Sequence, residues 1–294
     1  MRSILTSALL ALLLILGSYG VTFAQSDDSS DPGTAAFNNG DYAGAMAAWK
    51  PKAEDNDPEA MNNIGNLYSL GLGVSKDPKQ AATWYEKAAQ LGFVLAQYNL
   101  ANLDYNRNDL KQAARWYTAA AQGGHAKAMY YLAQMYESGD GVEENKTEAA
   151  KWYGKASDQE LPEGEYEYGQ RLINGEGIDQ NTQKGSDLVL KAAEAGYGKA
   201  QYMMANYYYR GKVIPKNLIE GYVWATQATD TIRPGRDLDR AQDLLSDIKS
   251  GMTGQERKAA DIELQAVAPK KDNNGGEGGG TSGQDPSSGS NPQQ

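Results

Sequence analysis

Small and apolar residues alternate with polar ones along the chain in two helical patterns. The first pattern has a small residue, an apolar residue four positions later, and a second small residue directly after it, as in Ala60, Ile64 and Gly65. Positions three or four apart lie on one face of an α-helix. The pattern therefore predicts a helix with a narrow apolar face, and it returns from Ala96, Ala128, Gly164 and Ala200.

The second pattern has a large residue, mostly Trp, at its centre. These residues are Trp84, Trp116, Trp152, Leu188 and Trp224, and we expect them to lie in the core. Three positions before them the residue is always small, which predicts that another helix crosses closely: Ala81, Ala113, Ala149, Gly185 and Gly221. Seven positions before them stands Asp or Asn, which caps a helix by accepting a bond from a free backbone N–H. These predicted caps are Asp77, Asp109, Asn145, Asn181 and Asn217.

Glycines mark the ends of both helices. Gly92, Gly124 and Gly196 follow the second helix, as expected of residues that end a helix in the left-handed conformation. The third copy has Glu160 there, so we expect a different turn. The link after the first helix reads GLGV at 71–74, GDGV at 139–142 and GEGI at 175–178, but GKVI at 211–214. The second copy lacks this link.

This self-similarity predicts five helical hairpins, at 57–92, 93–124, 125–160, 161–196 and 197–232. One such hairpin cannot bury its own apolar face, so the hairpins must stack on one another. Residues 25–56 hold a degenerate copy, in which Asp41 and Ala45 match Asp77 and Ala81, and we expect it to cap the stack. Apolar positions at 233–267 predict two further helices that cover the C-terminal end.

The motifs quoted above resemble the Sel1-like repeat, a relative of the tetratricopeptide repeat. WYEKAA at 84–89 and the G-x-G-V links are the most specific pieces of this likeness, which covers roughly residues 31–232. The resemblance implies an all-α fold, a right-handed α-solenoid of antiparallel helix pairs. It also implies a role in holding other proteins together, and exported members of the family commonly act as adaptors or regulators of envelope processes.

The two ends of the chain differ from the repeats. Residues 1–24 have a basic start at Arg2, an apolar run from Ile4 to Leu16, and small residues Thr22 and Ala24 before Gln25. This order predicts a cleavable signal peptide, since the apolar run is too short for a membrane span. We therefore expect a bacterial periplasmic or secreted protein without stable membrane anchoring after cleavage. Residues 268–294 are rich in Gly, Ser and Asn and predict a disordered tail.

Composition argues against several classes of function. The formal net charge is −10, and no cluster of Lys and Arg suggests a nucleic-acid binder. The absence of Cys excludes disulfides and thiolate chemistry. His125 is the only His, and we interpret it as a solvated turn residue rather than a metal ligand. Ser246 and Lys249 fit an S-x-x-K spacing, but the partner motifs of that enzyme class are missing. We predict a protein that is not an enzyme and needs no cofactor or metal.

Two columns in the first helices indicate where a partner would bind. Each copy has a side-chain amide, at Asn66, Asn102, Gln134, Gln170 and Asn206, off the apolar face. A carboxamide both donates and accepts, so such a ladder could hold the backbone of an extended peptide. A column of aromatic residues lies nearby, at Tyr98, Tyr130, Tyr166 and Tyr202. Two other interpretations stay open, in which the amides are merely solvated and the tyrosines pack between repeats.

The sequence thus predicts an exported scaffold or adaptor that binds a protein or peptide partner in the concave groove of a solenoid. Its expected role is the regulation or assembly of a cell-envelope process. Two alternatives remain, a protein that binds or modifies cell-wall peptidoglycan and a secreted effector that binds host proteins. The oligomeric state and the identity of the partner are not predicted.

Overall fold

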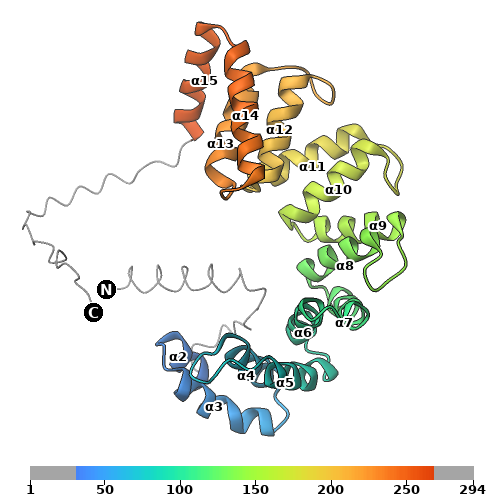
Figure 1. The fold of residues 1–294 in the computed structure, drawn as a ribbon, viewed down its shortest axis with the longest axis vertical. Helices are drawn as coiled ribbons and strands as arrows, with labels where there is room; N and C mark the ends of the chain where they lie inside the picture. Colours follow the sequence, from blue (N-terminus) through green and yellow to red (C-terminus); the bar gives the residue numbers. More distant parts are fainter. Residues whose placement is uncertain (1–30, 268–294) are drawn as a thin grey trace, which may run out of the picture.

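The computed structural model describes residues 31–267, and these form an arc of α-helices (Figure 1). Every regular element in this range is a helix, which confirms the predicted all-α solenoid. The helices before and within the first three repeats are α2 (Pro32–Asn38), α3 (Tyr42–Glu54), α4 (Pro58–Leu70), α5 (Pro78–Gln90), α6 (Val94–Asn106), α7 (Leu110–Gln122), α8 (Ala126–Ser138) and α9 (Lys146–Asp158). The remaining helices are α10 (Pro162–Asn174), α11 (Thr182–Glu194), α12 (Gly198–Arg210), α13 (Leu218–Thr231), α14 (Arg236–Gly251) and α15 (Gly254–Val267).

The predicted signal peptide at 1–24 and the predicted tail at 268–294 lie outside the described residues. Across residues 31–267, no helix combines the length and the apolar character that a membrane span requires.

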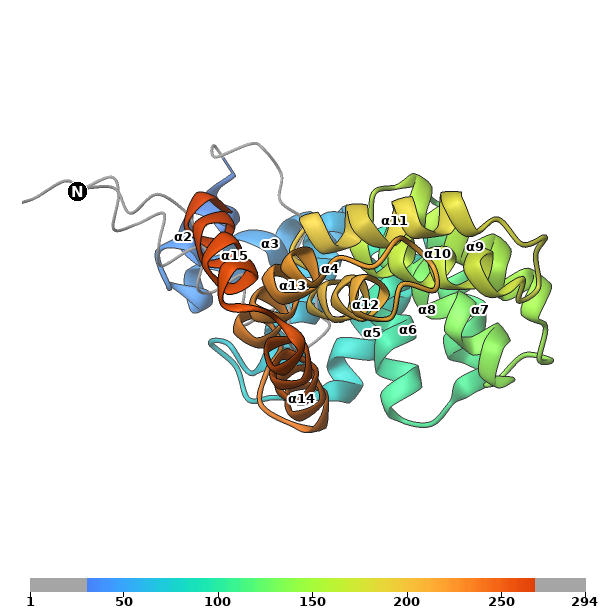
Figure 2. The ribbon, with the colours of Figure 1, turned by 90° about the horizontal axis from the view of Figure 1, so that it is seen from above.

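The helices pack as consecutive antiparallel pairs, from α4 with α5 to α12 with α13. The α2–α3 pair packs on α4 at one end, and α14 and α15 pack on α13 at the other. In Figure 1, α6 and α8 lie on the inner side of the arc and α7 and α9 on its outer side. Figure 2 shows the same stack from above. We call the surface formed by α4, α6, α8, α10 and α12 the concave face.

The predicted column of capping residues is confirmed. Asp77 accepts bonds from the backbone N–H groups of Lys79 and Gln80, at 2.9 and 3.1 Å. The other four residues of this column cap α7, α9, α11 and α13 in the same manner. Glu160 corrects one expectation, because its φ of 56° is the left-handed conformation that Gly92, Gly124 and Gly196 adopt. The third copy therefore turns like the others, with a residue that is strained there.

The core lies one position away from the predicted Trp column. Trp84 and Trp116 are only partly buried, and Trp152 is the most buried Trp of the column. The next position is buried in every repeat, at Tyr85, Tyr117, Tyr153, Val189 and Ala225. Lys87, Arg115 and Lys155 cover the Trp rings, with the cation 3.9 to 5.3 Å from the ring centroid. Trp84 and Trp116 thus lie at the rim of the core, where a cation can reach the ring from solvent, whereas Trp152 is buried in the core as predicted.

The small residues let paired helices approach each other, as predicted. The closest approach is in the fourth repeat, where a Cβ atom on Gly169 would lie 2.7 Å from the carbonyl oxygen of Gly185. A Cβ atom on Gly185 would in turn lie 2.6 Å from the carbonyl oxygen of Gly169. Neither position has room for any other side chain, so both glycines are required by packing.

The link glycines perform a similar role between neighbouring repeats. A Cβ atom on Gly141 would lie 2.1 Å from the Leu110 carbonyl oxygen, and one on Gly177 would lie 2.2 Å from that of Lys146. The last link has Val213 at the equivalent position, and its side chain excludes the same close approach. A cleft of about 830 Å³ opens there between the 211–217 link and α11.

Candidate functional site on the concave face

The amide column is bonded internally in the first two repeats. Tyr85 donates its hydroxyl to Asn66 Oδ1 at 2.7 Å, and Tyr117 donates to Asn102 Oδ1 at 2.5 Å. Asn66 is fully buried, and Asn99 reaches it from the next repeat at 3.3 Å. These two amides therefore fix the first helix of each repeat to the second, because a buried hydroxyl needs an acceptor.

The same column changes its partners toward the C-terminus, since the second-helix tyrosine bonds elsewhere in the third repeat and is absent from the last two. In the third repeat Tyr153 donates to Glu137 Oε2 at 3.0 Å, and Gln134 bonds the Tyr130 hydroxyl at 3.0 Å. Val189 and Ala225 replace the tyrosine in the last two repeats and can donate no bond. Gln170 instead donates to Tyr207 of the following repeat at 2.7 Å.

Asn206 is the amide that the missing tyrosine leaves unsatisfied. Its Oδ1 atom is buried and accepts no hydrogen bond from the described residues. Ala225 stands where Tyr85 and Tyr117 donate in the earlier repeats, so the sequence itself explains the missing hydrogen-bond donor. A buried amide oxygen without a donor costs stability.

The aromatic column divides in the same way. Tyr98 is buried and stacks on His125 with ring centroids 4.2 Å apart. Tyr130, Tyr166 and Tyr202 are partly exposed. Tyr131, one position after the column, is 38% exposed and meets Tyr130 edge to face at 5.4 Å. Within the aromatic column and the position after it, the third repeat is therefore the first with exposed ring surface, although Tyr105 near the end of α6 is also exposed.

His125 corrects the interpretation of a solvated turn residue. It caps α8, since its Nδ1 atom accepts the backbone N–H of Ala128 at 3.1 Å. Burial, with a smaller contribution from Lys127, lowers the pKa of His125 to about 4. The corresponding N-cap positions of α6, α10 and α12 hold Phe93, Leu161 and Tyr197, so this column is apolar or aromatic. This apolar column is the sequence signal that could have predicted a packed ring at His125.

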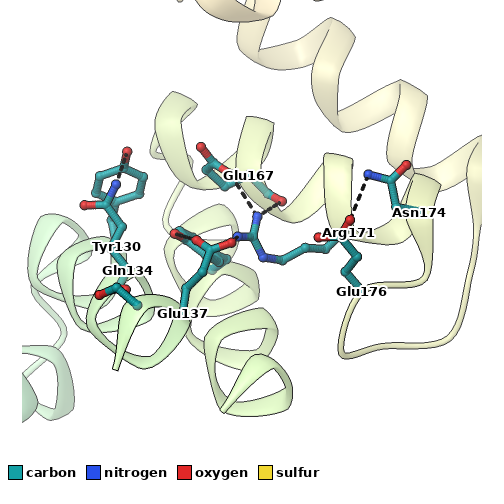
Figure 3. Close-up of polar contacts among 9 residues, drawn as sticks. Tyr130, Gln134, Glu137, Glu167, Arg171, Asn174 and Glu176 are labelled. Carbon is teal, nitrogen blue, oxygen red and sulfur yellow. Dashed lines mark hydrogen bonds and ion pairs between the residues drawn. The ribbon is translucent and has the colours of Figure 1, made fainter. Parts of the chain in front are cut away.

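One buried cation joins the third and fourth repeats. Arg171 is 5% exposed and forms ion pairs with Glu137 of α8 and Glu167 of α10 (Figure 3). Its guanidinium also lies over the Tyr153 ring at 4.1 Å. Burial and the two nearby carboxylates of Glu167 and Glu163 raise the pKa of Tyr130. The middle of the concave face therefore has several carboxylates, with the buried cation Arg171 held between Glu137 and Glu167.

A pocket lies at the C-terminal end of the concave face, and it includes two of the predicted tyrosines. Tyr166 of α10 and Tyr202 of α12 line it together with Lys199 and Met203. The link before α14 and the first turns of α14 complete the wall, and the volume is about 320 Å³. We call it the α12–α14 pocket. The sequence did not predict it, because it depends on where α14 packs.

The structure separates the predicted site residues into two groups. Asn66 and Tyr98 are buried, so the prediction that they contact a partner is corrected. Asn102, which accepts from Tyr117, and Asn206, whose Oδ1 atom is buried, are themselves partly exposed, so for them the partner contact stays a prediction. The second group keeps partly exposed side chains on the concave face and stays a prediction: Tyr130, Gln134, Tyr166, Gln170 and Tyr202.

A family model for the Sel1 repeat matches the chain five times, at residues 58–93, 94–125, 126–161, 162–197 and 198–230. The chain belongs to the Sel1 repeat family. Each match begins one residue after the boundary expected from the sequence pattern. Sel1 repeat proteins generally serve as scaffolds for protein–protein interaction and are typically not enzymes.

Two known proteins illustrate the relationship. The crystal structure of a Sel1 repeat protein from Oxalobacter formigenes has 27% sequence identity, covers 80% of this chain and 98% of its own, and superposes with a TM-score of 0.68. A putative Sel1-like repeat-containing protein of Acanthamoeba polyphaga mimivirus is 36% identical over 58 residues. That match spans 20% of this Sel1 repeat chain and only 11% of the viral protein.

Proposed function

We propose that this Sel1 repeat protein is an exported scaffold or adaptor that binds a protein or peptide partner on its concave face. Membership of the family supports the scaffold role. The observation that carries the assignment to this face is the partly exposed aromatic surface of Tyr130, Tyr131, Tyr166 and Tyr202, which ends in the α12–α14 pocket. Tyrosine rings supply contact area at a low entropic cost, which suits an interface.

The binding surface occupies the last three repeats rather than the whole arc. The amides of the first two repeats bond the second-helix tyrosines and are not available in the same way. Beyond the carboxylates of the middle, the tyrosines of α10 and α12 are partly exposed. A partner would therefore contact repeats three to five, and a peptide-backbone ladder along all five repeats is not part of this proposal.

Site-specific photo-crosslinking in living cells tests the proposal. A photoreactive phenylalanine analogue would replace Tyr131 or Tyr202 on the concave face, and exposed Thr83 on α5 as the matched control. We expect a discrete crosslinked protein band from the two concave positions and none from Thr83. Equal crosslinking from the outer position, or none from the concave face, would assign the partner surface elsewhere.

The second part of the proposal concerns export to the cell envelope. It rests on the basic, apolar and small-residue order of residues 1–24. Fractionation of a bacterial expression host, with mass spectrometry of the N-terminus, would check it. We expect the chain to begin at Gln25 in the periplasmic or secreted fraction. A full-length chain that stays in the cytoplasm would contradict the export and envelope parts of the proposal and leave the scaffold part standing.

A further inference from the structure

The α12–α14 pocket has a chemical character that differs from the rest of the molecule. Its walls are the rings of Tyr166 and Tyr202 and the apolar side chains of Met203 and Ile232. A volume of about 320 Å³ is at the lower end of the range for ligand pockets, about 300–1,000 Å³. The space therefore has room for one large apolar side chain. Met can adapt its shape to such a side chain.

The rim of the pocket carries two cations, Lys199 and Arg240, and one carboxylate, Asp237, although the chain has a formal net charge of −10. Lys199 lines it and forms no ion pair with a carboxylate of the described residues. Arg240 lines it from α14, and its pair with Asp237 is long, at 3.4 Å, with both side chains more than half exposed. Exposed pairs of this kind contribute little energy, so a ligand carboxylate could replace Asp237 as the partner of Arg240.

From this geometry we infer that the pocket binds an acidic peptide segment of the partner, with an aromatic or large aliphatic side chain inserted and carboxylates on Lys199 and Arg240. This inference rests on the proposed function and specifies its partner. In an extended chain, side chains two residues apart point to the same side. The acidic residues are therefore expected two positions before or after the inserted one. The carboxylates in the middle of the concave face, Glu137, Glu163 and Glu167, would repel such a segment and confine it to this end.

Titration calorimetry with short capped peptides tests the inference on the mature chain. The probe is acetyl-Glu-Ser-Phe-Ser-Glu-amide, compared with versions carrying Gln for both Glu, Lys for both Glu, or Ala for Phe. We expect the Glu–Phe probe to bind about tenfold more tightly than the Gln version. The Lys version should bind more weakly than the Gln version. The Ala version should also lose about tenfold, because the pocket stays unfilled.

The pocket is identified by a matched pair of double variants. Lys199→Gln with Arg240→Gln should abolish the preference for Glu over Gln. The control, Lys127→Gln with Arg236→Gln, removes the same charge from exposed positions that do not line the pocket, and it should keep the preference. Lys127 holds the same register position in α8 that Lys199 holds in α12. Neither double variant alters a buried residue.

Several outcomes would overturn the inference. These are equal affinity for the Glu and Gln probes, tighter binding of the Lys version, an unchanged preference in the pocket variant, or no binding of any probe at millimolar concentration. If the wild-type chain sediments with purified peptidoglycan and the pocket variant does not, the pocket would be assigned to a saccharide polymer instead. The proposed function is judged separately, since crosslinking from Tyr131 or Tyr202 could succeed although every peptide fails.

Discussion

A single hydrogen-bonding position shows how one residue type acquires different roles in successive repeats. Asn102 accepts from buried Tyr117, whereas the Oδ1 atom of Asn206 has no donor among the described residues. We expect Asn102→Ala to lower the free energy of unfolding by about 1–3 kcal/mol, because the Tyr117 hydroxyl stays buried without an acceptor. Asn206→Ala removes an amide oxygen that already lacks a donor. It should change the free energy of unfolding by less than about 0.5 kcal/mol.

Urea denaturation of both variants measures this difference. Because the two residues hold equivalent positions in their helices, the comparison separates the hydrogen bond from the cost of truncation. Equal losses in the two variants would show that the tyrosine bond does not stabilise the first repeats.

His125 supplies a prediction about pH at the same scale. Its pKa is about 4 in the folded chain, and a histidine in an unfolded chain has a pKa of about 6.5. As the pH falls from about 6.5 to about 4, the unfolded state binds a proton that the folded state does not, so stability decreases. We expect this residue to account for a loss of about 1–2 kcal/mol over that window, after allowance for its partial exposure.

The variant His125→Asn isolates this effect, because Asn keeps the capping function of α8 and does not titrate. Asp104 titrates in the opposite sense, since burial raises its pKa to about 6, so only a comparison with the wild type is informative. Unfolding free energies at pH 7 and pH 4.5 should differ less in the variant. An identical difference in both proteins would mean that the ring is not shielded as the structure shows.

Local rules predict the elements well where one position decides the outcome. The capping column, the small-residue columns and the link glycines each follow from a single steric or hydrogen-bonding requirement, and the structure contains all three. The choice between Trp84 and Tyr85 as the core residue could not be made in this way. Both are large aromatic residues on adjacent positions, and a small rotation of the helix decides which one is buried.

The links between helices carry a prediction at the scale of the element. Gly141 has a φ of 71°, and a Cβ atom there would lie 2.1 Å from the Leu110 carbonyl oxygen. Gly141→Ala should therefore cost about 2–4 kcal/mol, since it combines a left-handed conformation with a clash against α7. Gly92 has a φ of 83° with open space around it, so Gly92→Ala should cost only about 1 kcal/mol.

Chemical denaturation of the two alanine variants checks this prediction. The difference between them measures the contact with the neighbouring repeat, because the conformational cost is common to both. Equal destabilisation would mean that the link does not need to approach α7. That result would also undermine the explanation of the cleft beside Val213, where the same glycine is missing.

At the scale of the whole molecule, the core of the described residues is a series of clusters along the arc rather than one interior. Trp116 packs against the cluster of the first repeats and against the next one, and Trp224 joins the last two clusters. The α12–α14 pocket could not be predicted from the sequence for a related reason. The link from Ile232 to Gly235 breaks the repeat register, so no column fixes where α14 lies against α12.

An array of this kind should respond locally to a defect in its end. Ile248 of α14 is fully buried in the last cluster, and Ile248→Ala should cost that end about 2–4 kcal/mol. Because each repeat contacts mainly its neighbours, amide hydrogen exchange should accelerate in α12 to α15 and stay unchanged in α4 to α7. Ile262→Ala, at a position that is 67% exposed, is the control and should leave exchange as it is. Uniform acceleration through all repeats would instead mean that the arc unfolds as one cooperative unit, and the separation of a structural N-terminal half from a binding C-terminal half would lose its energetic basis.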